Sequence, residues 1–163
     1  MLDATAKLPL KDAELFRQTN CIGGKWVQAD SGKTITVRNP ATGEPVGEVP
    51  AMGAAETRRA IEAAHAALPA WRALLAKDRA AILRKLNDRM LENADDLAAI
   101  MTAEQGKPLA ESKGEVAYAA SFIEWFAEEG KRVYGDTIPQ NAKGRRIVVT
   151  KEPVGVFAAI TPW

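Results

Sequence analysis

The residue types that most often carry catalysis or bind metals are scarce in this sequence. Cys21 and His65 are its only cysteine and its only histidine, and they lie far apart along the chain. A zinc site needs three or four such ligands. Cys21 lies in a short predicted strand beside Gly23-Gly24, where no neighbour would lower the pKa of its thiol. We therefore predict no metal site and no catalytic residue, and we interpret Cys21 as a small apolar strand residue.

Two pairs of glutamates lie one helical turn apart, and paired carboxylates can act as a general acid and a general base. The pairs are Glu111 with Glu115 and Glu124 with Glu128. Both lie on helical faces of mixed charge, which is typical of a solvated surface. Nothing in the 163 residues brings a nucleophile, a base and oxyanion donors together, so residue chemistry alone does not indicate the reaction.

The strongest indication of a ligand site is the apolar run from Val154 to Ile160. A run without polar alternation predicts a strand that is covered on both faces, as in a parallel sheet. Ligands of such sheets bind at the carboxyl ends of the strands. We therefore expect a ligand to lie against Ile160, Thr161, Pro162 and Trp163. Because a domain rarely ends inside a buried element, we also expect this chain to be the front part of a larger enzyme.

The elements that would position this strand follow one another in blocks. A loosely held lead-in precedes a front end of small antiparallel strands, which is marked by the turn residues Gly23-Gly24. A helical region comes next, then an arm whose short apolar strand has charged flanks, and then the terminal strand. The expected fold class is α/β. The predicted blocks are residues 1–18, 19–50, 51–135, 136–152 and 153–163.

Four amphipathic helices are predicted within the helical block. The first runs from residue 54 to 68 and is expected to end at Pro69. The third is expected to end at Gly106, where a glycine can adopt a left-handed conformation. The fourth is expected from residue 108 to about 134. Its predicted apolar stripe consists of Val116, Ala119, Ala120, Ile123 and Ala127, widened by Phe122 and Phe126.

The composition excludes several classes of partner. With 22 Lys and Arg residues against 21 Asp and Glu, the formal net charge is +1, which argues against a nucleic-acid footprint. No apolar run is long enough to span a membrane, and the first residues have no apolar core of a signal peptide. A single cysteine fits a reducing compartment. We expect a cytoplasmic protein that binds neither nucleic acid nor membranes.

Four stretches of the chain resemble the aldehyde dehydrogenase superfamily. They are Ile22–Trp26 (IGGKW), Asn39–Gly43 (NPATG), Glu104–Leu109 (EQGKPL) and Glu152–Trp163 (EPVGVFAAITPW). The run from Tyr118 to Pro139, YAASFIEWFAEEGKRVYGDTIP, together with EQGKPLAESKGE, is most similar to bacterial NADP-dependent succinate-semialdehyde dehydrogenases. The resemblance extends from about Ala13 to Trp163.

This resemblance implies an oxidoreductase that oxidises succinic semialdehyde to succinate with NADP or NAD, through a cysteine thiohemiacetal and a thioester. It places residues 51–135 in a Rossmann-like cofactor domain, whose sheet begins at 153–163 and whose cofactor pocket is lined by residues 160–163. It also implies a homo-oligomer formed through residues 137–152. No residue matches the family's catalytic cysteine or glutamate, so the 163 residues alone are expected to be inactive. Glutarate semialdehyde or another aldehyde as substrate stays open, as does a non-catalytic helical interaction module.

Overall fold

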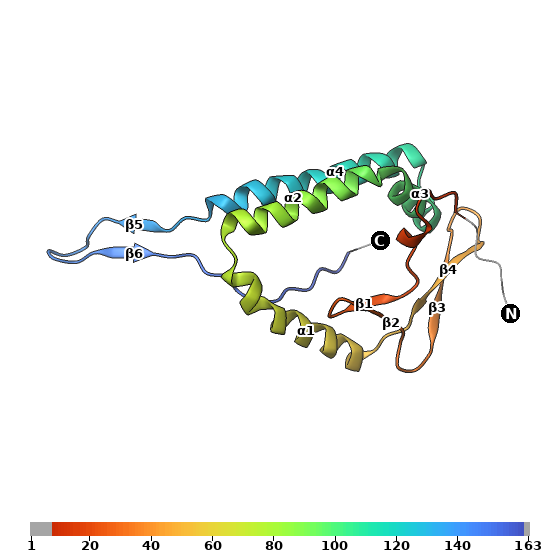
Figure 1. Ribbon diagram of the computed structural model, residues 1–163, viewed down its shortest axis with the longest axis horizontal. Coiled ribbons are helices and arrows are strands. Elements are labelled where there is room, and N and C mark those ends of the chain that lie inside the picture. Colours follow the sequence, from red (N-terminus) through yellow and green to blue (C-terminus); the bar gives the residue numbers. More distant parts are fainter. Residues whose placement is uncertain (1–7, 162–163) are drawn as a thin grey trace.

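The structure is a computed structural model, and it describes residues 8–161 (Figure 1). In this part of the chain, two small β-hairpins come first, four consecutive α-helices follow, and a third β-hairpin comes last. The helices are α1 (Ala54–Ala73), α2 (Ala76–Glu92), α3 (Ala94–Gln105) and α4 (Leu109–Glu129), with the short 3-10 helices η1 (Ala13–Leu15) and η2 (Gly130–Arg132). The strands are β1 (Asn20–Ile22), β2 (Lys25–Val27), β3 (Thr34–Arg38), β4 (Pro45–Pro50), β5 (Asp136–Ile138) and β6 (Ile147–Val149). No described helix is both long enough and apolar enough to cross a membrane.

The front end consists of the antiparallel pairs β1–β2 and β3–β4, as predicted. Gly23 and Gly24 join β1 to β2 with φ values of 59° and 77°. Two successive positive φ angles belong to the tight turns whose twist matches that of the flanking strands, and glycine adopts them without a steric penalty. This turn places Cys21 opposite Trp26 in the register of the pair.

The lead-in is tied to the helices, whereas the sequence predicted a loosely held segment. The N–H groups of Lys11 and Asp12 donate hydrogen bonds to the carboxylate of Asp96 at 3.0 and 2.8 Å. Asp96 is buried in the first turn of α3, so this carboxylate satisfies two backbone donors of a segment more than 80 residues away in sequence. These hydrogen bonds lower the pKa of Asp96.

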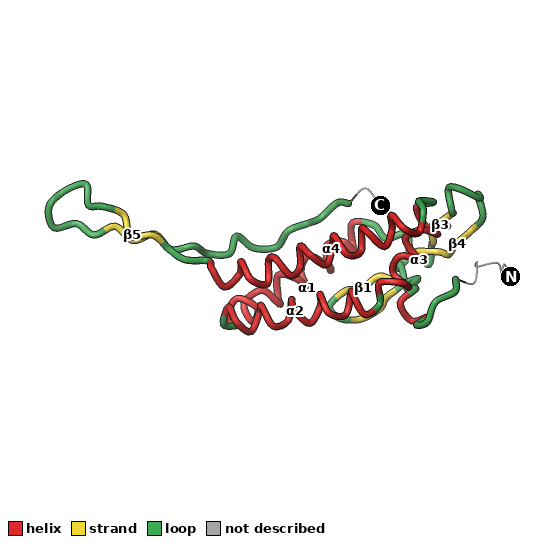
Figure 2. The backbone as a smooth tube through the Cα atoms, turned by 90° about the horizontal axis from the view of Figure 1, so that it is seen from above, coloured by secondary structure: helices red, strands yellow, loops and turns green. Residues whose placement is uncertain are grey.

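The antiparallel helices α2 and α4 form the main packed layer, and α3 crosses one end of them (Figures 1 and 2). Small residues allow this close approach, since Ala120 and Ala127 of α4 are almost fully buried. Asn87 of α2 is also buried, and its amide donates a hydrogen bond to the backbone carbonyl of Ala120 at 2.9 Å. A second polar contact joins α3 to α4, where the hydroxyls of Thr102 and Ser112 lie 2.8 Å apart.

The third helix ends as predicted, at Gly106. Its φ is 79°, and its N–H donates to the carbonyl of Thr102 at 2.8 Å. A Cβ at this position would lie 2.8 Å from the ring of Pro40, so both the backbone conformation and the packing require glycine. The contact with Pro40 joins the helical region to the turn between β3 and β4.

The first and fourth helices differ from the prediction at their C-terminal ends. Helix α1 continues through Pro69 to Ala73, although this proline has no N–H to donate within the helix, and the helix ends one turn later. Helix α4 ends earlier than predicted, at Glu129, and the tighter η2 turn follows it. The predicted stripe of α4 is also too wide, since Ala119, Phe122 and Phe126 are exposed.

Helix α1 diverges from α2 and α4 and is held at its N-terminal end (Figure 1). There Glu56 accepts hydrogen bonds from the N–H groups of Asp30 and Gly53, both at 3.0 Å. Arg59 donates to both carboxylate oxygens of Asp30, at 2.7 and 2.8 Å. The backbone hydrogen bonds lower the pKa of the buried Glu56, so this carboxylate stays ionised as the cap of α1.

The strand predicted from Val154 to Ile160 does not form. Residues 151–161 adopt neither helix nor strand, and Val154, Phe157 and Ile160 are largely exposed. A strand is defined by hydrogen bonds to a neighbouring strand, and residues 8–161 contain no strand beside this segment. The arm does form as the hairpin β5–β6, with Thr137 opposite Val148, and it protrudes from the helices (Figures 1 and 2).

Candidate functional site

The residues predicted to bind a ligand lie at the end of the exposed C-terminal segment. Ile160 is 97% exposed, and Thr161 is exposed as well. Pro162 and Trp163 lie outside the residues that the structure describes. The assignment of a cofactor site to residues 160–163 therefore stays a prediction.

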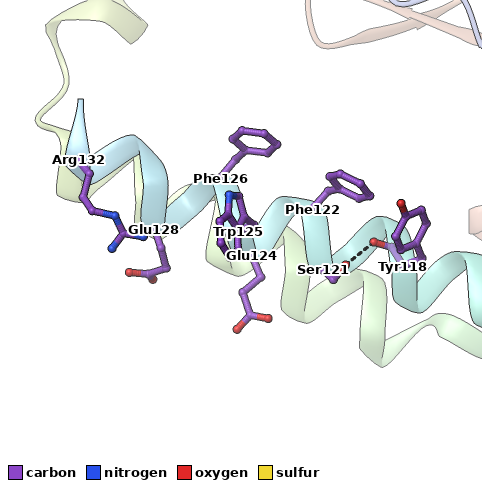
Figure 3. Close-up of a pocket in the computed structure, with 8 residues that line it drawn as sticks. All are labelled: Tyr118, Ser121, Phe122, Glu124, Trp125, Phe126, Glu128 and Arg132. Atoms are coloured by element: carbon purple, nitrogen blue, oxygen red, sulfur yellow. Dashed lines mark hydrogen bonds between the residues drawn. The ribbon is translucent and has the colours of Figure 1, made fainter. Parts of the chain in front are cut away.

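A groove on α4, which we call the aromatic groove, has a volume of about 580 Å³ (Figure 3). Its aromatic side chains arise from helical spacing, because positions three and four apart share one face. Tyr118 and Phe122 meet edge to face, with ring centroids 4.8 Å apart. This is a preferred geometry of aromatic pairs. The lining residues are Tyr118, Ser121, Phe122, Glu124, Trp125, Phe126, Glu128 and Arg132.

The rim of the aromatic groove is ionic. Arg84 of α2 donates to Glu124 at 2.7 Å and to Glu128 at 2.6 Å. Lys131 contacts the other carboxylate oxygen of Glu128 at 2.6 Å. The hydrogen bonds from Lys131 and Arg84 lower the pKa of Glu128. A general acid must hold its proton near neutral pH, so Glu128 is suited to an ion pair and not to acid catalysis.

The other residues singled out by the sequence do not come together. Cys21 is exposed on β1, His65 is exposed on α1, and Glu115 pairs with Lys107. Within residues 8–161, no group of three or more His, Cys, Asp or Glu side chains could hold a metal ion. The aromatic groove therefore offers an apolar contact surface with ionic ends, and none of its lining side chains is an activated nucleophile.

Sequence reasoning missed a second cavity of about 500 Å³, which lies among β3, α2, α3 and α4. Apolar side chains from all four elements line it, including Val37, Met90 and Met101. Glu104 borders this cavity, and the partial burial of its carboxyl raises its pKa. Gln105 also lines it, and its Oε1 is buried without a hydrogen-bond partner among the described residues. Helical periodicity places the α3 residues of this lining on one face of the helix. It does not reveal that this face leaves a cavity against its neighbours.

Comparison with known proteins gives one consistent family. The family model described as "Aldehyde dehydrogenase family" matches residues 26–163. The glutarate-semialdehyde dehydrogenase of Pseudomonas putida is 67% identical over 156 residues, which are 96% of this chain and 32% of that protein. The NADP(+) succinate-semialdehyde dehydrogenase of Escherichia coli is 62% identical over the same lengths.

The backbone agrees with these sequence matches. A crystal structure of succinate-semialdehyde dehydrogenase from Burkholderia pseudomallei superimposes with a TM-score of 0.88 at 63% identity, over 90% of this chain and 30% of that one. This chain thus spans about a third of the length of the curated relatives that it matches. The α/β arrangement of small antiparallel strands and helices is therefore the arrangement found in the corresponding part of these enzymes. The family model matches 138 of the 163 residues, and the chain therefore belongs to the aldehyde dehydrogenase family.

Proposed function

We propose that this chain is the N-terminal part of an NAD(P)-dependent dehydrogenase that oxidises a short semialdehyde with a terminal carboxylate. The observation that carries the proposal is the identity of 62–68% to relatives named as succinate- or glutarate-semialdehyde dehydrogenases. Succinic semialdehyde is our first candidate substrate, because of the resemblance of the α4 region to that subfamily. Glutarate semialdehyde is the second, because the glutarate-named relatives are 67% and 68% identical.

In this proposal NADP or NAD is the cofactor, and it accepts the hydride released by the aldehyde. The name of the Escherichia coli relative includes NADP(+), and one similar structure is titled as a complex with nicotinamide adenine dinucleotide. Of this chain, Ile160, Thr161, Pro162 and Trp163 would form part of the pocket wall. Ile160 suits that role because its exposed apolar side chain is free to be covered.

We further propose that residues 153–163 become a strand of the cofactor-binding sheet when neighbouring strands are present, and that residues 51–135 belong to the same domain. The remaining arm, residues 136–152, would pair with a second copy of the chain. It protrudes from the helices (Figure 2), and Val148 and Val149 of β6 are exposed. An exposed apolar strand with free edge groups favours pairing with another chain.

The substrate is tested by expressing the complete coding sequence and following NADPH or NADH formation with each semialdehyde. A value of kcat/KM about tenfold higher for one semialdehyde identifies the preferred chain length, since one methylene in an apolar pocket is worth about tenfold or more. Residues 1–163 expressed alone should form no NADPH. If the complete protein oxidises neither semialdehyde, the proposed substrate class is wrong.

The cofactor wall is tested by Ile160→Asn in the complete protein. We expect the KM for NADP to rise, with Ile35→Asn on β3 as the control, because Ile35 is also exposed. Equal kinetics of the two variants would place the cofactor elsewhere. Deletion of residues 140–144 at the arm tip should lower the oligomeric state in analytical ultracentrifugation, and an unchanged oligomer would contradict the role of the arm.

A further inference from the structure

A cavity of about 400 Å³ lies where the arm joins the helices, and we call it the cationic pocket. Three separate parts of the chain form it: the junction of α1 and α2, the η2 turn, and the segment that returns from the arm. Trp71 supplies an aromatic surface, with 40% of the residue exposed. Because the walls come from three segments, a ligand here would hold the base of the arm against the helices.

The charge of the cationic pocket favours an anion. Four cations line it, Arg72, Arg79, Lys131 and Lys151, against the single carboxylate of Glu152. Arg72 pairs with Glu152 at 3.1 Å and Lys131 pairs with Glu128 at 2.6 Å, while Arg79 donates to the carbonyl of Leu74. Lys151 has no hydrogen bond or ion pair to any residue of the described range. Its ammonium group is therefore available for a ligand.

The start of α2 adds backbone donors to the same pocket. Ala76 is both the first residue of α2 and part of the pocket lining. The preceding residue is Leu75, whose side chain cannot accept a hydrogen bond, and no described residue accepts one from the Ala76 N–H. The N-terminus of this 17-residue helix thus presents the Ala76 N–H and a partial positive charge, with the carboxylate of Asp78 in the same turn, while the N–H groups of Asp78 and Arg79 donate to the carbonyl of Leu75. Helix N-termini and guanidinium groups together are typical of phosphate sites.

We propose that the cationic pocket binds a phosphate dianion, either free phosphate or the phosphate group of a small metabolite. Lys151 and Arg79 would contact its oxygens, and the Ala76 N–H would donate to one of them. The pocket lies at the base of the arm, to which Lys151 belongs, and the proposal does not depend on the proposed enzymatic activity.

Isothermal titration calorimetry of the intact protein tests the proposal, with sodium phosphate as the probe and sodium chloride at equal ionic strength as the reference. Lys151→Gln should weaken phosphate binding by about tenfold or more, the usual cost of losing a hydrogen bond to a charged group. Lys143→Gln is the matched control, because it makes the same charge change at the exposed tip of the arm. This control should leave the affinity unchanged.

Parallel titrations with AMP distinguish the two sources of phosphate. If AMP binds more tightly than phosphate and Lys151→Gln loses this binding, the ligand is a nucleotide whose base contacts Trp71. If AMP and phosphate bind equally tightly, the pocket recognises the phosphate group alone. The proposal is wrong if phosphate does not bind, if Lys151→Gln binds it as tightly as the original protein, or if both lysine variants weaken binding equally.

Discussion

Asn87 connects α2 to α4, and its replacement by aspartate tests the packing of these two helices. The residue is 5% exposed, and its amide donates a hydrogen bond to the carbonyl of Ala120 at 2.9 Å. Asn87→Asp keeps the size of the side chain but replaces the donor with a carboxylate oxygen. The variant therefore loses the hydrogen bond and places a buried negative charge against a carbonyl oxygen. The substitution adds no cation that could pair with this charge.

The expected loss of stability has two parts. The lost hydrogen bond costs about 1 kcal/mol, and an unpaired buried charge costs about 3 kcal/mol more. In a cooperative folding unit of about 150–250 residues 1 kcal/mol corresponds to about 2–4 °C in Tm, so the expected decrease is about 8–16 °C. Burial also raises the pKa of the new carboxyl in the folded state. The destabilisation should therefore be complete at neutral pH and become smaller as the pH falls through that raised pKa.

Thermal unfolding of the intact protein, followed by circular dichroism at pH 7 and at a mildly acidic pH, measures both effects. Asp88→Asn is the control, because Asp88 is the exposed neighbour on the same helix and should change Tm little. A decrease for Asn87→Asp below about 3 °C, without dependence on pH, would refute the buried contact between Asn87 and Ala120.

Three further variants examine the same region. Ala127→Leu should destabilise the protein by about 1–3 kcal/mol in urea unfolding, because Ala127 is fully buried, whereas Ala117→Leu on the exposed side should have little effect. Glu104→Gln should raise Tm at pH 8 and leave it unchanged at pH 4: burial raises the pKa of Glu104, so the stability present when it is protonated is lost as the pH rises through that pKa. An equal effect at both values of pH would contradict this. Arg84→Gln should cost about 1 kcal/mol or less, since its ion pairs are partly exposed, and the difference should shrink in high salt. A difference independent of salt would show that packing, not charge, is responsible.

Features that depend on adjacent residues could be predicted from the sequence alone. Gly106 ends α3 and Gly23-Gly24 turn the β1–β2 hairpin, because a positive φ is a local demand that glycine meets. The four helices follow from apolar periodicity within each segment. The aldehyde dehydrogenase motifs are likewise local strings, and the family match confirms them.

Other features depend on contacts between distant segments, and only the tertiary structure decided them. The sequence does not show that Asp96 binds the lead-in or that Arg84 bridges Glu124 and Glu128, because any nearby cation or donor would satisfy the same carboxylates. Phe122 and Phe126 have the spacing of a buried stripe, yet they are exposed, since burial requires an opposing surface and not only a period. The run from Val154 to Ile160 has the composition of a strand, but residues 8–161 offer it no neighbouring strand. Strand formation is a property of two segments, so composition alone could not determine the conformation of this one.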